Sequence, residues 1–173
     1  DHVRTCLDTL GPQRLGHGVR SVEDPRVLER VVAQGVALEV CPVSNVALGV
    51  YSDLSSVPLP QLMEAGATIA LGADDPLLFG SQLASQYATM RAAHHLTDAQ
   101  LADLARMSIS ASRAPDSVRR RVLGEIDAWL EATGTPADPV GRQAATLATR
   151  RGKPELEGER FDALWKGEAG AAG

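Results

Sequence analysis

The chain has 173 residues, of which 44% are hydrophobic and 23% charged, and its formal net charge is −5. These values are typical of one soluble globular domain. The net negative charge and the small number of aromatic residues, two each of Trp, Tyr and Phe, argue against a nucleic-acid-binding groove and a basic membrane-binding patch. We therefore expect a small-molecule partner and neither a nucleic acid nor a membrane. The oligomeric state is left open.

The two cysteines, Cys6 and Cys41, do not indicate a disulfide framework, and no apolar run reaches the roughly 18 residues that span a bilayer. These features favour a cytoplasmic protein. The chain begins with Asp1 and not with Met. We therefore expect upstream sequence to be missing.

Strand-like and helix-like segments alternate in the first half of the chain. A helix that Asp24 caps, Pro25 begins and Gly35 ends lies between the first two expected strands, and a shorter helix at 61–65 precedes the third. This order favours parallel βαβ units, in which functional residues lie just past the carboxyl ends of the strands. The three expected strands are residues 14–17, 37–41 and 68–72.

Helical patterns dominate the second half up to about residue 130. A capping-box pattern beginning at Thr97 predicts a helix to about residue 112, and a last amphipathic helix is expected after Pro115. Another helix is expected at 80–93. From residue 133 the composition turns to Gly, Ala, Pro and charged residues, which predicts a disordered tail after a domain of residues 1–132.

Two adjacent carboxylates, Asp74 and Asp75, follow the third expected strand and precede Pro76. Asp-Pro pairs are common in turns and Asp often caps helices, so both residues have a purely structural interpretation. The alternative is that the two side chains divide a functional task, one binding a metal and the other a ligand, because a carboxylate oxygen is a good zinc ligand.

His17 lies between two glycines just after the first expected strand, which allows a ligand to approach the imidazole closely. A single histidine is commonly structural, but near a metal it could orient or deprotonate a water molecule. Cys41 is interpreted as a core residue, and Ser44 and Asn45 are expected to shape a loop through side-chain to backbone bonds. The remaining histidines are interpreted as surface residues: His2, His94 and His95.

Three segments, 14–20, 38–46 and 71–80, together resemble three successive motifs of the adenosine deaminase family. The resemblance covers residues 1 to about 130. It implies an α/β fold, namely part of a TIM (β/α)₈ barrel whose strands correspond to the sixth to eighth, followed by carboxyl-terminal helices. It also implies Zn²⁺ as the cofactor.

The resemblance implies a role for each of three residues. His17 would be the catalytic residue that holds and helps deprotonate the attacking water, Asp74 would be the metal ligand, and Asp75 would bind the purine substrate. The chain lacks the His-x-His pair and the His-Ala-Gly-Glu motif that family members carry upstream. Smaller departures are Gly72-Ala73, where Asn-Thr or Asn-Ser is frequent, and Met107, where many members have Asn.

The expected function is hydrolytic deamination of adenosine or a related 6-aminopurine compound with release of ammonia. The missing motifs imply that this chain alone is inactive. The alternatives are a deaminase of adenine or of aminofutalosine, and a non-catalytic half-barrel remnant.

Overall fold

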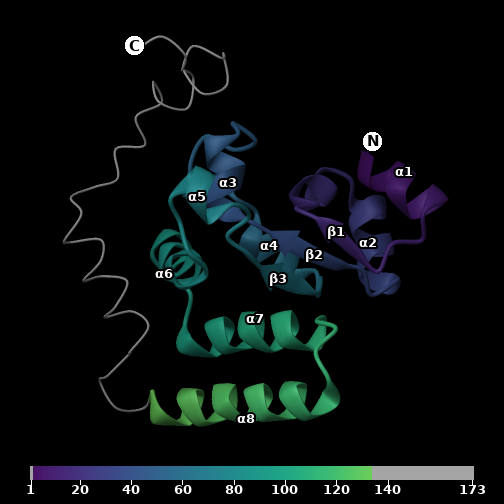
Figure 1. Cartoon of the computed structure of the whole chain (residues 1–173). Coiled ribbons are helices and arrows are strands. Elements are labelled where there is room, and N and C mark those ends of the chain that lie inside the picture. Colours follow the sequence, from purple (N-terminus) through teal and green to yellow (C-terminus); the bar gives the residue numbers. More distant parts are fainter. Residues whose placement is uncertain (1, 134–173) are drawn as a thin grey trace, which may run out of the picture.

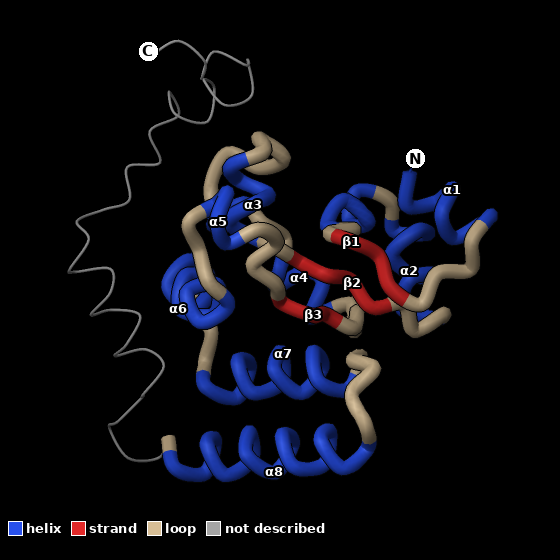
Figure 2. Tube along the Cα trace, viewed as in Figure 1, coloured by secondary structure: helices blue, strands red, loops and turns tan. Residues whose placement is uncertain are grey.

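The computed structural model describes residues 2–133, which form a three-stranded parallel sheet surrounded by helices (Figure 1). The strands are β1 (Arg14–Gly16), β2 (Ala37–Val40) and β3 (Ile69–Leu71), in the order β1-β2-β3 (Figure 2). In the register, Leu38 lies opposite both Leu15 and Ile69. The predicted parallel βαβ arrangement is therefore confirmed. Whether these strands are the sixth to eighth of a complete barrel stays a prediction.

The connections between the strands contain helices and short 3₁₀ turns. Asp24 caps the crossover helix between β1 and β2 by accepting hydrogen bonds from the backbone N–H groups of Arg26 and Val27, and Pro25 occupies its first position, as predicted. The elements up to β3 are α1 (His2–Thr9), η1 (Val19–Glu23), α2 (Pro25–Ala33), α3 (Pro42–Ala47), η2 (Leu54–Ser56) and α4 (Leu59–Glu64).

Four helices follow β3 in the part of the chain that the structure describes. The capping box at Thr97 is present, because the Thr97 hydroxyl accepts a bond from the Gln100 N–H while the Gln100 side chain accepts one from the Thr97 N–H. α7 packs against β3 and α8 packs against α7, so these two helices form successive layers on one side of the sheet (Figure 1). The helices are α5 (Pro76–Phe79), α6 (Leu83–His94), α7 (Asp98–Ser110) and α8 (Asp116–Ala132).

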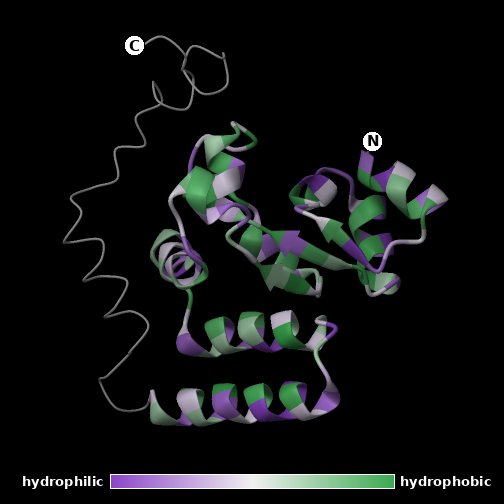
Figure 3. Cartoon of the chain, in the orientation of Figure 1, coloured by the Kyte–Doolittle hydropathy of each residue, from purple (hydrophilic) through white to green (hydrophobic). Residues whose placement is uncertain are grey.

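The hydrophobic core lies against one face of the sheet, to which alternate residues of β2 and β3 point. Leu38 and Val40 of β2 and Ile69 of β3 are completely buried. β3 is drawn in the green of hydrophobic residues (Figure 3). Leu104 brings α7 into the same core. α8 contributes no fully buried residue, and its Trp129 packs at the margin of the core.

One expectation about the helices was wrong, and one helix was not predicted. The helix expected at 80–93 is confirmed as α6, which begins at Leu83. The short helix α5 was not predicted, and it ends at Gly80, which has a left-handed conformation (φ 64°). The segment expected to be a loop around Ser44 is the short helix α3, which Pro42 begins. The disordered tail predicted from residue 133 lies, apart from Thr133, outside the described residues. None of the described helices is long and apolar enough to cross a membrane.

Candidate active site at the strand ends

His17 directly follows β1 and has a left-handed backbone conformation with φ 58°. Its backbone N–H donates to the Glu39 carbonyl on β2 at 2.9 Å, which fixes it at the carboxyl end of the sheet. The next residue, Gly18, is also left-handed, and a Cβ there would lie 2.7 Å from a Leu38 methyl group. A non-glycine residue in this region costs about 1–3 kcal/mol, and such strain concentrates at functional sites.

Asp74 follows β3 and shares this unusual backbone conformation, with φ 57°. The turn that carries it begins at Gly72, whose N–H donates to the Val40 carbonyl at 2.8 Å. A Cβ at Gly72 would approach the Cys41 sulfur to 3.2 Å, so the absence of a side chain lets β3 leave the sheet close to β2.

The structure brings His17 and Asp74 together. His17 Nε2 lies 3.6 Å from Asp74 Oδ2, and each side chain is 36% exposed. Ser44 Oγ donates to the same Asp74 Oδ2 at 2.6 Å, whereas Asp74 Oδ1 accepts no hydrogen bond from the residues that the structure describes. One imidazole and one carboxylate therefore lie side by side, and both are partly exposed to solvent.

Ser44 and Asn45 contact the two predicted site residues and do not only shape the backbone as expected. Both are buried in the first turns of α3, with Asn45 Nδ2 lying 3.1 Å from His17 Nδ1. The prediction missed this role. The available signal was their place directly after β2, the strand between those that carry His17 and Asp74.

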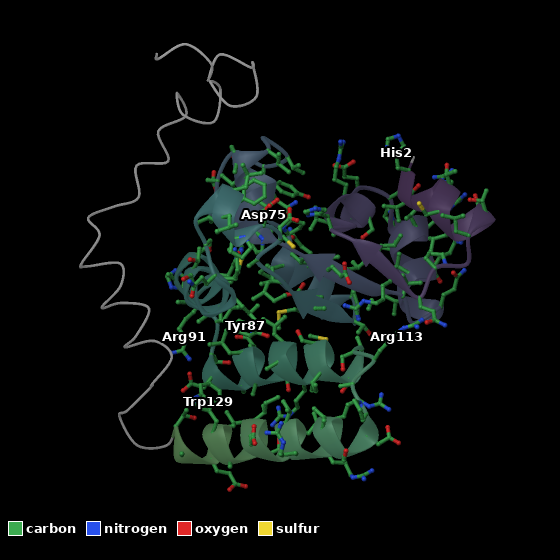
Figure 4. The ribbon with its side chains drawn as sticks, in the orientation of Figure 1. His2, Asp75, Tyr87, Arg91, Arg113 and Trp129 are labelled. Carbon is green, nitrogen blue, oxygen red and sulfur yellow. The ribbon has the colours of Figure 1, made fainter. Side chains whose placement is uncertain are left out.

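Asp75 lies beside Asp74 in the sequence but makes different contacts. Its Oδ1 caps α5 by accepting bonds from the N–H groups of Leu77 and Leu78 at 2.9 and 3.0 Å. This carboxylate therefore does have the helix-capping role that its sequence position allows. Its Oδ2 accepts no hydrogen bond from the described residues, and the residue is exposed near α3 and α5 (Figure 4).

The other candidate residues either lie away from His17 and Asp74 or have an unreactive side chain. Cys41 is buried as predicted, and burial, together with the negative charge of Asp74, raises the pKa of its thiol to about 11, which keeps it protonated near neutral pH. His2 and His95 are exposed as predicted. His94 corrects the surface interpretation, because it is half-buried at the end of α6, and burial lowers its pKa.

An open cavity of about 690 Å³ adjoins the site on the β1 side. His17, Asn45 and residues of α1, η1 and α2 are among the residues that line it. Its volume lies within the range of small-molecule sites. Asp74 and Asp75 do not line it, whereas His17 both lines it and contacts Asp74.

The donors fit only part of a zinc site. Among residues 2–133, no group of three or more His, Cys, Asp or Glu side chains is placed to hold one metal ion. Zinc in catalytic sites is usually bound by three protein ligands. The Oδ1 atom of Asp74, which accepts no hydrogen bond from the described residues, could be one zinc ligand beside the His17 imidazole. The further ligands would have to come from outside the described residues.

The comparisons with known proteins agree on one family. The adenosine deaminase family model matches residues 1–129. A putative adenosine/adenine deaminase of Streptomyces coelicolor is 57% identical over 130 residues, which cover 75% of this chain and 38% of that protein. An adenine deaminase of Agrobacterium fabrum is 38% identical over 126 residues, which cover 73% and 39%.

Solved structures show the same pattern of partial coverage. The adenine deaminase of Arthrobacter aurescens matches with a TM-score of 0.72 at 33% identity, covering 75% of this chain and 40% of that one. A cog1816 amidohydrolase of Burkholderia ambifaria with bound Zn matches with a TM-score of 0.63 at 23% identity, over 76% of this chain and 38% of that one, a likeness in fold alone.

The fold is an α/β fold with a parallel sheet, and the candidate site lies at the strand ends. The chain belongs to the adenosine deaminase family. It spans about two fifths of the length of the relatives named above.

Proposed function

We propose that the complete protein containing this chain is a zinc-dependent hydrolase that deaminates a 6-aminopurine compound, adenosine or adenine, and releases ammonia. The single observation that carries the proposal is the approach of His17 and Asp74 to 3.6 Å at the carboxyl ends of two parallel strands. Family membership supports the reaction class, since relatives matched over this region are named adenosine or adenine deaminases.

Each site residue has a distinct task in this proposal. Asp74 would hold the metal through the oxygen that Ser44 does not occupy. His17 would contact the attacking water and help to activate it, and Asp75 would use the oxygen not engaged in the α5 cap to bind the purine ring. Zinc, when bound, supplies the Lewis acidity that makes water a nucleophile near neutral pH.

The overall reaction adds water to the ring carbon that carries the amino group. That carbon loses its amino nitrogen as ammonia and keeps the water oxygen, so the product is a 6-oxopurine.

Adenine is a second candidate substrate. Adenine deaminases are among the relatives at 38–41% identity and include a structure with a TM-score of 0.72. A free base needs no ribose subsite, whereas a nucleoside does, so the two substrates need substrate sites of different size.

The test uses the complete protein, purified with zinc, and measures ammonia release from adenosine, adenine and aminofutalosine. Turnover of adenosine or adenine at about 1–10³ per second is expected. Turnover of aminofutalosine alone would redirect the substrate assignment, and absence of turnover with all three would favour a non-catalytic remnant.

A further inference from the structure

Gln86 is a buried amide that is hydrogen-bonded at both ends. It lies on α6 and is 0% exposed, its Oε1 accepts a bond from the Val43 N–H at 3.3 Å, and its Nε2 donates to the Ser81 hydroxyl at 3.0 Å. A backbone N–H can only donate, so its partner must be the amide oxygen. The contact with Val43 therefore fixes which way the Gln86 amide faces.

The bond to Val43 supplies an acceptor at the start of α3. Pro42 begins this helix, and the Cys41 side chain at its N-cap makes no capping hydrogen bond. The first N–H groups of a helix have no acceptor within the helix. The Val43 N–H is one of these groups, and its acceptor comes from α6, 43 residues further along the chain. The position of α3 therefore depends on Gln86.

The bond to Ser81 ties the same amide to the connection between β3 and α6. Ser81 is buried and directly follows Gly80, at which α5 ends. This connection, residues 72–82, also carries Asp74. α3 contacts both α5 and α6 (Figure 1). Gln86 thus joins α3 to the connection that carries Asp74.

Ser44 and Asp74 meet where these two segments face each other. Ser44 is 0% exposed, and its hydroxyl donates to Asp74 Oδ2 at 2.6 Å. An ionised carboxylate only accepts hydrogen bonds, so this bond holds one oxygen and leaves the other, Oδ1, for a different partner. Because Ser44 directly follows Val43, a shift of α3 would move its hydroxyl relative to Asp74.

We propose that Gln86 is a positioning residue that holds Ser44 against Asp74 and so fixes the direction in which Asp74 Oδ1 points. The consequence for zinc and catalysis rests on the proposed function, in which Oδ1 binds the metal. Groups that orient a metal ligand typically contribute about 10–100-fold to metal affinity or activity, so we expect an effect of that size.

The zinc affinity of the complete protein provides the main test, measured for each folded variant by competition with a chelator of known affinity. Gln86→Met keeps the length of the side chain but makes neither bond. It should bind zinc about 10–100-fold more weakly than the unaltered protein, because Ser44 is no longer held in place and Asp74 can rotate. Unchanged zinc affinity in this variant would overturn the proposal.

Gln86→Glu is the conservative variant. Its carboxylate can accept a bond from the Val43 N–H, and the Ser81 hydroxyl can turn to donate to it. Because both links are kept, Gln86→Glu should have a zinc affinity close to that of the unaltered protein. Equal losses of affinity in Gln86→Met and Gln86→Glu would contradict the role of the two bonds.

Met90→Leu is the matched control on the same helix. Met90 is also 0% exposed and belongs to the hydrophobic core. The substitution disturbs the packing of α6 but leaves both bonds of Gln86 in place, so the zinc affinity should not change. A loss as large as that in Gln86→Met would show that zinc binding responds to any change in the packing of α6.

Ser44→Ala covers the case in which Gln86→Met does not fold. It removes the hydroxyl that contacts Asp74 and should weaken zinc binding by about the same 10–100-fold. Unchanged zinc affinity in Ser44→Ala would overturn the proposal without reference to Gln86.

A crystal structure of the metal-free Gln86→Met variant separates this proposal from the proposed function. Ser44 Oγ and Asp74 Oδ2 should lie beyond hydrogen-bond distance in that structure, and an unchanged contact would overturn the positioning role. If the unaltered protein deaminates no 6-aminopurine, the proposed function fails, but this structure still decides whether Gln86 holds Ser44 against Asp74.

Discussion

The strand-end corner of His17, Ser44, Asn45 and Asp74 and the helical pair α7–α8 are built by opposite rules. The helical pair consists of long regular elements with standard start signals, such as the capping box at Thr97. The corner contains two non-glycine residues with φ near 60° and two polar side chains buried to about 1% exposure or less. Strain and buried polarity are costly, so their concentration in one corner supports the proposal that this corner is the active site.

Metal removal should cause the largest loss of activity. Treating the complete protein with a chelator should lower activity by about 10³-fold or more, because Lewis-acid stabilisation contributes several kcal/mol and each 1.36 kcal/mol is tenfold in rate. Ammonia release should return when zinc is added back. Full activity in a protein shown to be free of zinc would rule out the proposed cofactor.

Substitution of His17 should cause the second-largest loss of activity. His17→Ala should lower kcat by about 10²–10⁴-fold, since it removes the side chain that we propose to contact the reacting water. The measurement is kcat for ammonia release at saturating substrate. His95→Ala, at an exposed histidine on the far end of α6, is the control and should leave kcat unchanged. Equal effects of the two substitutions would show that His17 has no special role.

Asp75 allows the capping and substrate-binding roles to be separated. Asn is about as good a helix cap as Asp, so Asp75→Asn should keep α5 intact while weakening a charge-assisted bond to the purine. Such a bond is worth about 1.5–3 kcal/mol, which predicts a KM increase of about 10- to 150-fold. Substrate titration of Asp75→Asn gives the answer, and a KM equal to that of the unaltered enzyme would leave Asp75 with its cap alone.

The smallest effect is expected in the helical pair. Thr97→Ala removes the hydroxyl that caps α7 and should lower the free energy of unfolding by about 1 kcal/mol without changing kcat. Thr97→Ser, which keeps the hydroxyl, should retain most of the stability. Denaturant unfolding of the complete protein measures both. A loss of activity with unchanged stability would contradict a purely structural role of the helical pair.

The difference between these two regions also explains which elements could be predicted from the sequence. The three strands, the α2 cap and the capping box follow from local patterns, and each is confirmed. α3 was missed because a six-residue helix has no useful period and depends on tertiary contacts. α5 was missed for the same reason, because a four-residue helix has no useful period.

The site was predictable in position but not in contacts. Placement after parallel strands predicted that His17 and Asp74 share one edge of the sheet, and the fold brings them to 3.6 Å. The contacts of Ser44 and Asn45 with these residues join α3 to the segments that follow β1 and β3, so no local pattern indicates them. The assignment of Asp74 to metal and Asp75 to substrate stays a prediction.

Zinc content of two neighbouring variants of the complete protein tests that assignment most directly. Asp74→Asn and Asp75→Asn change one oxygen each at adjacent positions, and both are purified in parallel and analysed for zinc per chain. We predict that Asp74→Asn loses most of its zinc, while Asp75→Asn keeps the amount found in the unaltered protein. Retention of zinc by Asp74→Asn together with its loss from Asp75→Asn would contradict the account.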